Sequence, residues 1–332
     1  MSRPRFGIGL RALPSPAECA RRGRLAEDLG FDVVSVFGDL GDPHPIPALI
    51  AIAAATSVVA LGPACLNPYT MHPVEIAGGM ARLDLASNGR AYLGLARGAW
   101  LKTIGVAQPR PVRSIREAAS VVRLLLSGEA SGFDGEVFNI PPGFTLSSPV
   151  PRRSLPLLVG AWGRQTVTMA GEVADELKVG GSANPDIVPV MRERLGVGAA
   201  RAGRLPQATG IVLGAVTVVD QDGNAARRYA RTAVARYFEV VASLDPTVRL
   251  PAGLLETVRA RLANGNAAGA GEIIPDDVLD RFCFAGTPKQ VSRQVHEVIG
   301  SGASRIEFGQ PFGLDCDAGL RLLAERVLTE FR

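Results

Sequence analysis

The chain has 332 residues, of which 47% are hydrophobic and 20% are charged, and its formal net charge is +4. This balance is ordinary for a globular enzyme, and no apolar run reaches the ~18 residues that cross a bilayer. No cluster of lysine and arginine alternates with aromatic residues, so the composition favours neither a membrane protein nor a nucleic-acid-binding one.

Targeting and metal signals are both weak in this sequence. Proline and arginine interrupt the first residues too early for a signal peptide, so we expect a cytoplasmic protein. The cysteines form no CxxC pair, which fits a reducing compartment, and the three histidines have no metal-ligand spacing. We therefore expect no bound metal.

Eight apolar runs have the length and composition of strands, and helical patterns alternate with them. The runs cover residues 6–10, 33–37, 58–64, 91–95, 157–160, 177–179, 211–219 and 305–308. Such alternation is compatible with a doubly wound sheet or a (β/α)8 TIM barrel, both of the α/β class. The number of strands, spread from end to end, favours the barrel, which needs about 250 residues.

Four helix starts are explicit in the sequence. Ser15 and Thr287 each precede a proline and stand three residues before Glu or Gln, which is the pattern of a capping box. Ser114, three residues before Glu117, predicts a third capping box, and Asn184 opens a fourth helix in a similar way.

We expect a single domain over residues 1–332. The residues beyond those that a minimal barrel needs lie in two excursions from it. Residues 128–154 are rich in proline, glycine and aromatic residues, and we expect a hairpin-like excursion there. Residues 244–275 interrupt the seventh strand–helix unit, and their Gly-, Ala- and Asn-rich part at 264–271 is expected to be mobile.

The segment 155–182 carries the clearest functional signal. Two short apolar runs end in glycine turns, Gly160-Ala161-Trp162-Gly163 and Gly180-Gly181, and a helical pattern joins them. Glycines at strand exits let the backbone approach a ligand, and the amino end of the following helix offers free N–H groups to an anion. The segment therefore predicts a shelf for a cofactor.

Other strand exits also carry polar side chains. Asp39 lies between glycines after the second strand, and Arg97 follows the fourth strand, where a charge normally needs an anionic partner. Asn67 and Thr70 follow the third strand. For these two, hydrogen bonds within a turn explain the residue types as well as contact with a ligand does, and His72 is open to a similar capping interpretation.

One dinucleotide-like pattern is discounted. Residues 7–12 match GxGxxG/A loosely, but the glycines lie inside a strand and no helix opens within the pattern. Gly7 and Gly9 more plausibly leave room for a planar ligand at the floor of the barrel.

Several segments resemble a known family. They are LNPYTMHPVEIA at 66–77, LGLARGAW at 93–100, GAWG and AGEVADELKVGG at 160–181, and IEFGQPFGLD at 306–315. Together they resemble the bacterial-luciferase-like superfamily, and most of all its deazaflavin-dependent branch typified by methylenetetrahydromethanopterin reductase. The resemblance implies a TIM barrel with insertions that binds coenzyme F420 or FMN at the carboxyl ends of its strands.

The resemblance also implies which residues hold the cofactor. A non-prolyl cis peptide behind the ring would fall at Ala64–Cys65, and the phosphate would lie near Gly160–Arg164 and Gly180–Ala183. The implied cofactor-binding set is Gly38, Asp39, Ala64, Cys65, Asn67, Thr70, Arg97, Gly98, Gly160, Ala161, Trp162, Gly163, Arg164, Gly180, Gly181, Ser182 and Ala183.

Two departures leave the proton donor and the substrate open. Pterin reductases of this branch usually carry a carboxylate in strand one, where this chain has Gly9. Many deazaflavin dehydrogenases carry a histidine where this chain has Leu40.

Three hypotheses follow. The first is an F420-dependent oxidoreductase that moves a hydride to or from a small-molecule substrate, with Asp39 or Glu307 as the proton carrier. The second is an FMN-dependent luciferase-like monooxygenase, and the third is a barrel that binds a ligand without turnover. By the same resemblance, the apolar helices at 47–55 and 74–85 would bury one face in a homodimer.

Overall fold

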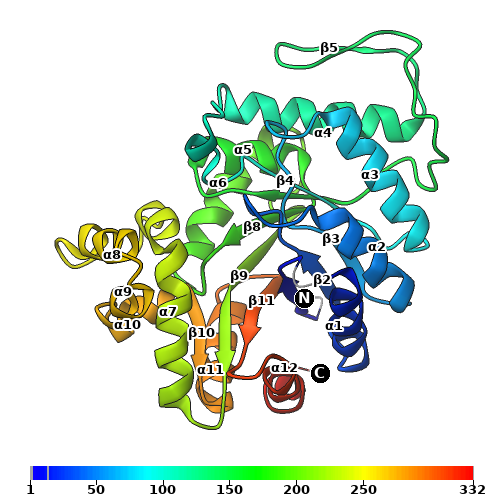
Figure 1. Cartoon of the computed structure of the whole chain (residues 1–332). Helices are drawn as coiled ribbons and strands as arrows, with labels where there is room; N and C mark the ends of the chain where they lie inside the picture. Colours follow the sequence, from blue (N-terminus) through cyan, green and yellow to red (C-terminus); the bar gives the residue numbers. More distant parts are fainter. Residues whose placement is uncertain (1–2, 13–14, 332) are drawn as a thin grey trace.

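The computed structural model describes residues 3–12 and 15–331 (Figure 1). Within these residues eight parallel strands form the barrel predicted from the sequence. Their order is β3 (Ala60–Pro63), β2 (Val33–Val36), β1 (Arg5–Leu10), β11 (Arg305–Phe312), β9 (Gly210–Val219), β8 (Glu176–Gly180), β7 (Leu157–Gly160) and β4 (Leu93–Ala96). Parallel bridges Leu61–Ala91 and Leu66–Leu95 close the ring between β3 and β4.

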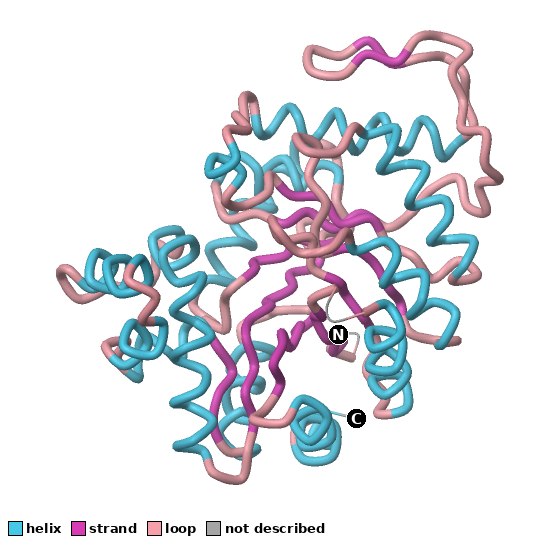
Figure 2. The backbone as a smooth tube through the Cα atoms, viewed as in Figure 1, coloured by secondary structure: helices cyan, strands magenta, loops and turns pink. Residues whose placement is uncertain are grey.

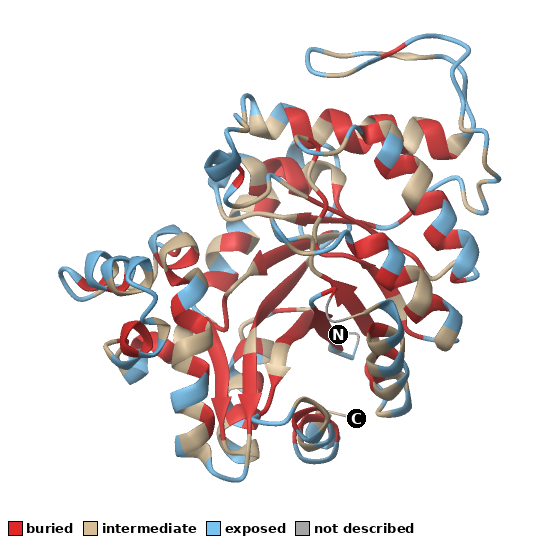
Figure 3. Ribbon diagram, in the orientation of Figure 1, coloured by how far each residue is buried: buried red, intermediate tan, exposed pale blue. Residues whose placement is uncertain are grey.

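Helices cover the outside of the barrel, as the tube in Figure 2 shows. Those that follow barrel strands are α1 (Pro16–Asp28), α2 (Pro45–Ala55), α3 (Pro73–Ala86), α4 (Pro111–Ser127), α5 (Arg164–Val173), α6 (Ile187–Arg201), α7 (Gly223–Val241) and α12 (Cys316–Arg326), with α11 (Pro288–Gly300) before β11. The strands are buried almost throughout (Figure 3), because the helices cover one face and the barrel interior the other. No helix of the described chain has both the length and the apolarity needed to cross a membrane.

Two of the four predicted helix starts have the predicted capping residue in the structure. Ser15 accepts a hydrogen bond from the Glu18 amide, and Thr287 forms a complete capping box with Gln290. The third capping box was wrong: α4 already begins at Pro111, so Ser114 is buried inside it and its hydroxyl donates to the Pro109 carbonyl (3.2 Å). Pro at the first helical position is the stronger start signal here.

The fourth helix starts later than predicted. α6 begins at Ile187, and Asn184 is a buried residue of the preceding turn, where its Oδ1 accepts from the Asp186 amide (3.0 Å).

The excursion at 128–154 contains the expected hairpin, formed by β5 (Phe133–Asp134) and β6 (Asn139–Ile140). It extends beyond α4 at the top of Figure 1. The buried carboxylate of Glu117 on α4 accepts three backbone N–H groups from residues 136–138, which holds the turn of the hairpin on the helix.

The second excursion is helical, and it leads into a strand that the sequence did not reveal. Residues 244–275 contain α8 (Leu254–Ala263) and α9 (Ala267–Glu272), so the stretch expected to be mobile is largely a helix capped by Asn266. After α10 (Asp276–Phe282), strand β10 (Cys283–Gly286) pairs with residues 216–219 of β9. The strand follows α10 without an intervening turn, so nothing in the sequence separates it from the helix. The short 3-10 segments are Leu101–Ile104, Ala242–Leu244 and Leu328–Phe331.

Candidate functional site

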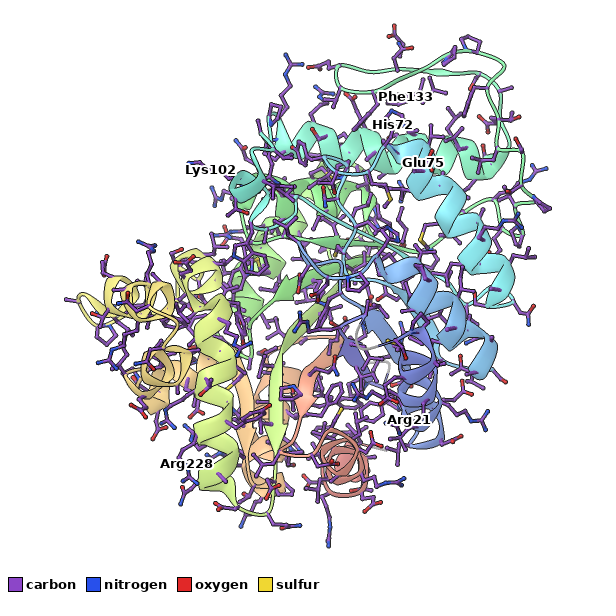
Figure 4. The ribbon with its side chains drawn as sticks, in the orientation of Figure 1. Arg21, His72, Glu75, Lys102, Phe133 and Arg228 are labelled. Carbon is purple, nitrogen blue, oxygen red and sulfur yellow. The ribbon has the colours of Figure 1, made fainter. Side chains whose placement is uncertain are left out.

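The carboxyl ends of the strands form one rim, and the residues predicted from the strand exits lie there because the strands are parallel. Asp39 follows β2, Asn67 follows β3, Arg97 follows β4, and the two glycine turns follow β7 and β8. His72 caps α3 by accepting the Val74 amide at Nδ1 (3.2 Å), which supports its capping interpretation. Figure 4 shows it beneath the hairpin that carries Phe133.

Ala64 and Cys65 form a cis peptide at the end of β3, as the resemblance implied. Glycines on neighbouring strands make room for it: a Cβ on Gly94 would overlap the Pro63 carbonyl, and one on Gly160 would lie 3.0 Å from the Cys65 Sγ. Burial raises the pKa of the Cys65 thiol to about 12. The thiol is therefore protonated at neutral pH and is no nucleophile.

The first glycine turn leaves an anion-binding helix end open. A Cβ added to Gly163 would meet no atom within 4 Å, and Gly163 caps α5 without a side-chain hydrogen bond. Within the described residues, no protein acceptor is hydrogen-bonded to the amides of 164–166. Three free N–H groups at the positive end of a helix dipole suit a phosphate.

The second glycine turn, at Gly180-Gly181, does not offer the free amides that were expected for a phosphate. The amides of Gly181 and Ser182 both donate to the Gly214 carbonyl, and the Ala183 amide donates to the Arg281 carbonyl (2.9 Å). These three amides are therefore engaged, and the turn contributes space instead: a Cβ on Gly180 would meet nothing within 4 Å. The Trp162 Nε1–H donates to the Gly180 carbonyl (3.0 Å) and ties the two turns together.

On the other side of the rim, Asn67 is used within its own turn. Its Oδ1 accepts the amides of Tyr69 (3.1 Å) and Thr70 (3.0 Å) and the Thr70 hydroxyl (3.1 Å). The side chain of Gly98, if it had one, would lie 3.2 Å from Asn67, and its φ of 84° is in the region that favours glycine. The turn is thus tightly built, which supports the structural interpretation of Asn67 and Thr70.

Arg97 and Asp39 are the two rim charges that remain available. Arg97 is exposed, and its guanidinium has no ion-pair partner within residues 3–12 and 15–331. The Asp39 side chain reaches solvent, yet the surrounding protein reduces its hydration, and this desolvation together with the charge of Asp42 raises its pKa. Lys178 and Arg11 oppose that rise. A carboxyl with a raised pKa can carry a proton closer to neutral pH.

Glu307 lies deeper, inside the barrel, and is fully buried. It is bonded to the Lys178 ammonium and the Ser35 hydroxyl, and an Arg305 nitrogen lies 3.6 Å away. Burial raises the pKa of its carboxyl, but Lys178 and Arg305 outweigh that effect, so the pKa is lowered. An ionised carboxylate held by these partners is a poor proton carrier, and this argues against Glu307 in that role.

The room expected beside Gly7 and Gly9 is filled by protein. A Cβ on Gly9 would clash with the Phe37 ring and lie 3.0 Å from Glu307 Oε1, while one on Gly7 would lie 3.1 Å from the Val33 Cβ. These glycines therefore admit side chains from neighbouring strands, and the interpretation as space for a planar ligand was wrong.

The interior charges form a network that sequence reasoning missed. Arg305 binds Glu176 (2.6 Å), the Ser35 hydroxyl lies 2.7 Å from the Tyr92 hydroxyl, and the Lys178 ammonium stands 4.9 Å from the centre of the Phe37 ring. One signal was present: Lys178 interrupts the apolar run 177–179, in a chain with only three lysines.

The Lys178–Glu307 pair yields a stability prediction. Lys178→Met leaves the Glu307 carboxylate buried without its ammonium partner, so we expect the free energy of unfolding to fall by about 3–5 kcal/mol. Urea unfolding followed by circular dichroism measures this. The double variant Lys178→Met/Glu307→Gln, which removes both charges, should recover part of the loss. A single variant as stable as the parent would show that the pair is not the main charge balance of the interior.

Comparison with known proteins identifies the family model that fits this chain. The model described as luciferase-like monooxygenase matches residues 2–305. The 5,10-methylenetetrahydromethanopterin reductase of Archaeoglobus fulgidus is 30% identical over 319 residues, covering 93% of this chain and 94% of that protein. The F420-dependent glucose-6-phosphate dehydrogenase of Microbacterium testaceum is 25% identical, covering 96% of this chain and 94% of that protein.

A solved structure gives the same fold. The coenzyme F420 dependent tetrahydromethanopterin reductase from Methanopyrus kandleri superposes with a TM-score of 0.89 at 24% identity, and the match covers 100% of both chains. At this identity the likeness supports the fold alone.

Proposed function

Since the chain belongs to the luciferase-like monooxygenase family, we propose that it is a coenzyme F420-dependent oxidoreductase that moves a hydride between the deazaflavin and a small organic substrate. One relative is named as a reductase and another as an F420-dependent dehydrogenase, and each aligns along nearly the whole chain. Their percentages of sequence identity to this chain are too similar to decide which relative's substrate this chain would use. The structural observation that carries the proposal is the open amino end of α5 beside the glycine exits of β7 and β8.

The residues present fit the cofactor. The amides of 164–166 would hold its phosphate, the Ala64–Cys65 bulge would lie behind its ring, and the open face of Gly180 would admit it. When bound, F420 supplies or accepts a hydride at C5 of the deazaflavin. The rim residues would orient the substrate beside the cofactor and limit the access of water.

Asp39 would donate or accept the proton that accompanies the hydride. A carbonyl or imine that gains a hydride on carbon gains a proton on oxygen or nitrogen, and the reverse reaction releases both. Asp39 is a rim carboxyl with a raised pKa, so it can exchange a proton with the substrate. Arg97 would bind an anionic part of the cofactor or the substrate.

We also propose a cytoplasmic homodimer. Helices α2 and α3 pack side by side, and each leaves residues exposed on its outer surface: Pro47 and Ala54 on α2, and Leu85, 44% exposed, on α3. These helices hold the apolar segments predicted to face a second copy. The sequence contains no CxxC pair, which fits a reducing compartment.

The first prediction from the proposed function concerns cofactor binding. F420 fluorescence should be quenched in a saturable way at micromolar cofactor. The Cβ of Gly180→Leu would meet no protein atom within 4 Å, so its side chain extends into the open space, and we expect cofactor affinity to fall about tenfold or more, which is about 1.4 kcal/mol. Gly196→Leu on α6 is the matched control, since a Cβ there also meets open space. A protein that binds FMN and takes up oxygen, but does not bind F420, would contradict the proposal.

The second prediction concerns Asp39. Asp39→Asn should lower kcat by about 10²–10³-fold while cofactor affinity stays unchanged, because only the proton transfer is lost. In the direction of substrate oxidation the carboxylate is the active form. The activity of the parent should therefore rise with pH through the raised pKa of Asp39. This rising limb of the pH profile should be absent in Asp39→Asn.

Asp42→Asn serves as the companion variant. Removing its negative charge lowers the pKa of Asp39, so the limb should move to lower pH with its height preserved. If Asp39→Asn retained the parent's pH profile, another group would be the proton carrier.

The third prediction concerns assembly. Sedimentation at micromolar concentration should give twice the mass of one chain, and Leu85→Glu should shift the protein toward monomer. Leu205→Glu, at a 75% exposed position after α6, should leave the mass unchanged. A parent protein that sediments as a monomer would rule out the homodimer.

A further inference from the structure

A groove of about 400 Å³ lies outside the barrel between α4, α5 and α6. Four guanidinium groups and one carboxylate line it. They belong to Arg116 on α4, Arg164 and Glu172 on α5, and Arg194 and Arg201 on α6. Of the residues that line this groove, Arg164 and Gln165 also belong to the first turn of α5, whose amides form the proposed phosphate site.

Helical spacing explains why these side chains converge. Residues 164, 168 and 172 are four apart and share one face of α5, and residues 194, 197 and 201 similarly share a face of α6. α5 packs against α4 on one side and α6 on the other, so the three faces meet along α5. Thr168 and Met169 form the floor of the groove.

The positive charge of the groove exceeds its negative charge. Glu172 is shared between Arg116 and Arg201 (3.8 Å), and Arg164 has only an exposed partner, Glu193 at 3.6 Å. Arg194 donates to the Trp162 carbonyl (2.9 Å) and has no carboxylate in the groove. The Arg164–Glu193 pair is exposed, and such a pair contributes about 0–1 kcal/mol, so an arriving anion can replace it at little cost. The Arg116–Glu172 pair is partly buried, so there an anion must compete with Glu172.

The groove begins at the proposed phosphate site. Arg164 and Gln165 line it and also form the first turn of α5, whose amides are free. From there it follows α5 to Glu172, away from the mouth. At 1.5 Å per residue this is a path of about 12 Å, long enough for several linked anionic groups.

We propose that this groove binds a chain of carboxylates that continues from a phosphate held at the amino end of α5. Within the proposed function, on which this inference rests, the chain is the glutamate tail attached to the phosphate of F420. Arg116, Arg164 and Arg201 provide the charge-assisted hydrogen bonds, because planar guanidinium groups match carboxylates in geometry. Glu172 then competes with the tail for Arg116 and Arg201.

Because Glu172 and the tail compete for the same arginines, removing the arginines and removing Glu172 should change cofactor affinity in opposite directions. Cofactor affinity is measured by fluorescence with two probes, F420 with a long glutamate tail and F420 trimmed to one glutamate. We expect the parent to bind the long form about tenfold more tightly. Arg116→Gln/Arg201→Ala should bring this ratio close to one, while Glu172→Gln should raise it severalfold, because it frees two guanidinium groups.

Controls separate the groove from folding and from the proposed function. Arg228→Ala removes an exposed charge from α7 and should keep the parent's ratio, and melting temperatures check that each variant is folded (Figure 4). If the parent binds both probes equally, or if Glu172→Gln gains nothing, the groove is not the tail site although the proposed function stands. If neither probe binds the parent, the proposed function is rejected and the groove with it.

Discussion

The parallel direction of all the barrel strands is the constraint on which the site depends. Because each strand enters at one end and leaves at the other, exits that are far apart in the sequence meet at one rim. That is why Asp39, Arg97 and the glycine turns after β7 and β8 share a mouth. It also sets the amino ends of the following helices at the same end, so the free amides of α5 lie at the same end of the barrel as the rim side chains.

The interior of the barrel supports this rim with charge as well as with apolar packing. Lys178 and Glu176 of β8 and Glu307 and Arg305 of β11 neutralise one another in a buried network. The glycines of β1 make the network possible, since a side chain at Gly9 would displace Phe37 and Glu307. The floor of the barrel beneath the rim is therefore filled by charged, polar and aromatic side chains.

Periodicity and glycine placement predicted the barrel, its eight strands and the rim. These features are local, since a strand exit is visible wherever an apolar run ends in glycine. The partners of interior side chains are not local: Glu307 meets Lys178 across 129 positions of sequence, and no spacing rule connects them. Likewise the amides of Gly181 and Ser182 looked available for a phosphate until the fold brought the Gly214 carbonyl against them. β10 was missed because it exists only as a partner for the far half of β9.

The central claim is that the amino end of α5 anchors the cofactor at the rim. A crystal structure of the protein with F420 tests it most directly, through the distances from the phosphate oxygens to the amide nitrogens of residues 164–166. We predict that at least one oxygen lies within about 3 Å of an amide nitrogen, as in a hydrogen bond. A phosphate held at another helix end, with these amides still facing solvent, would contradict the account.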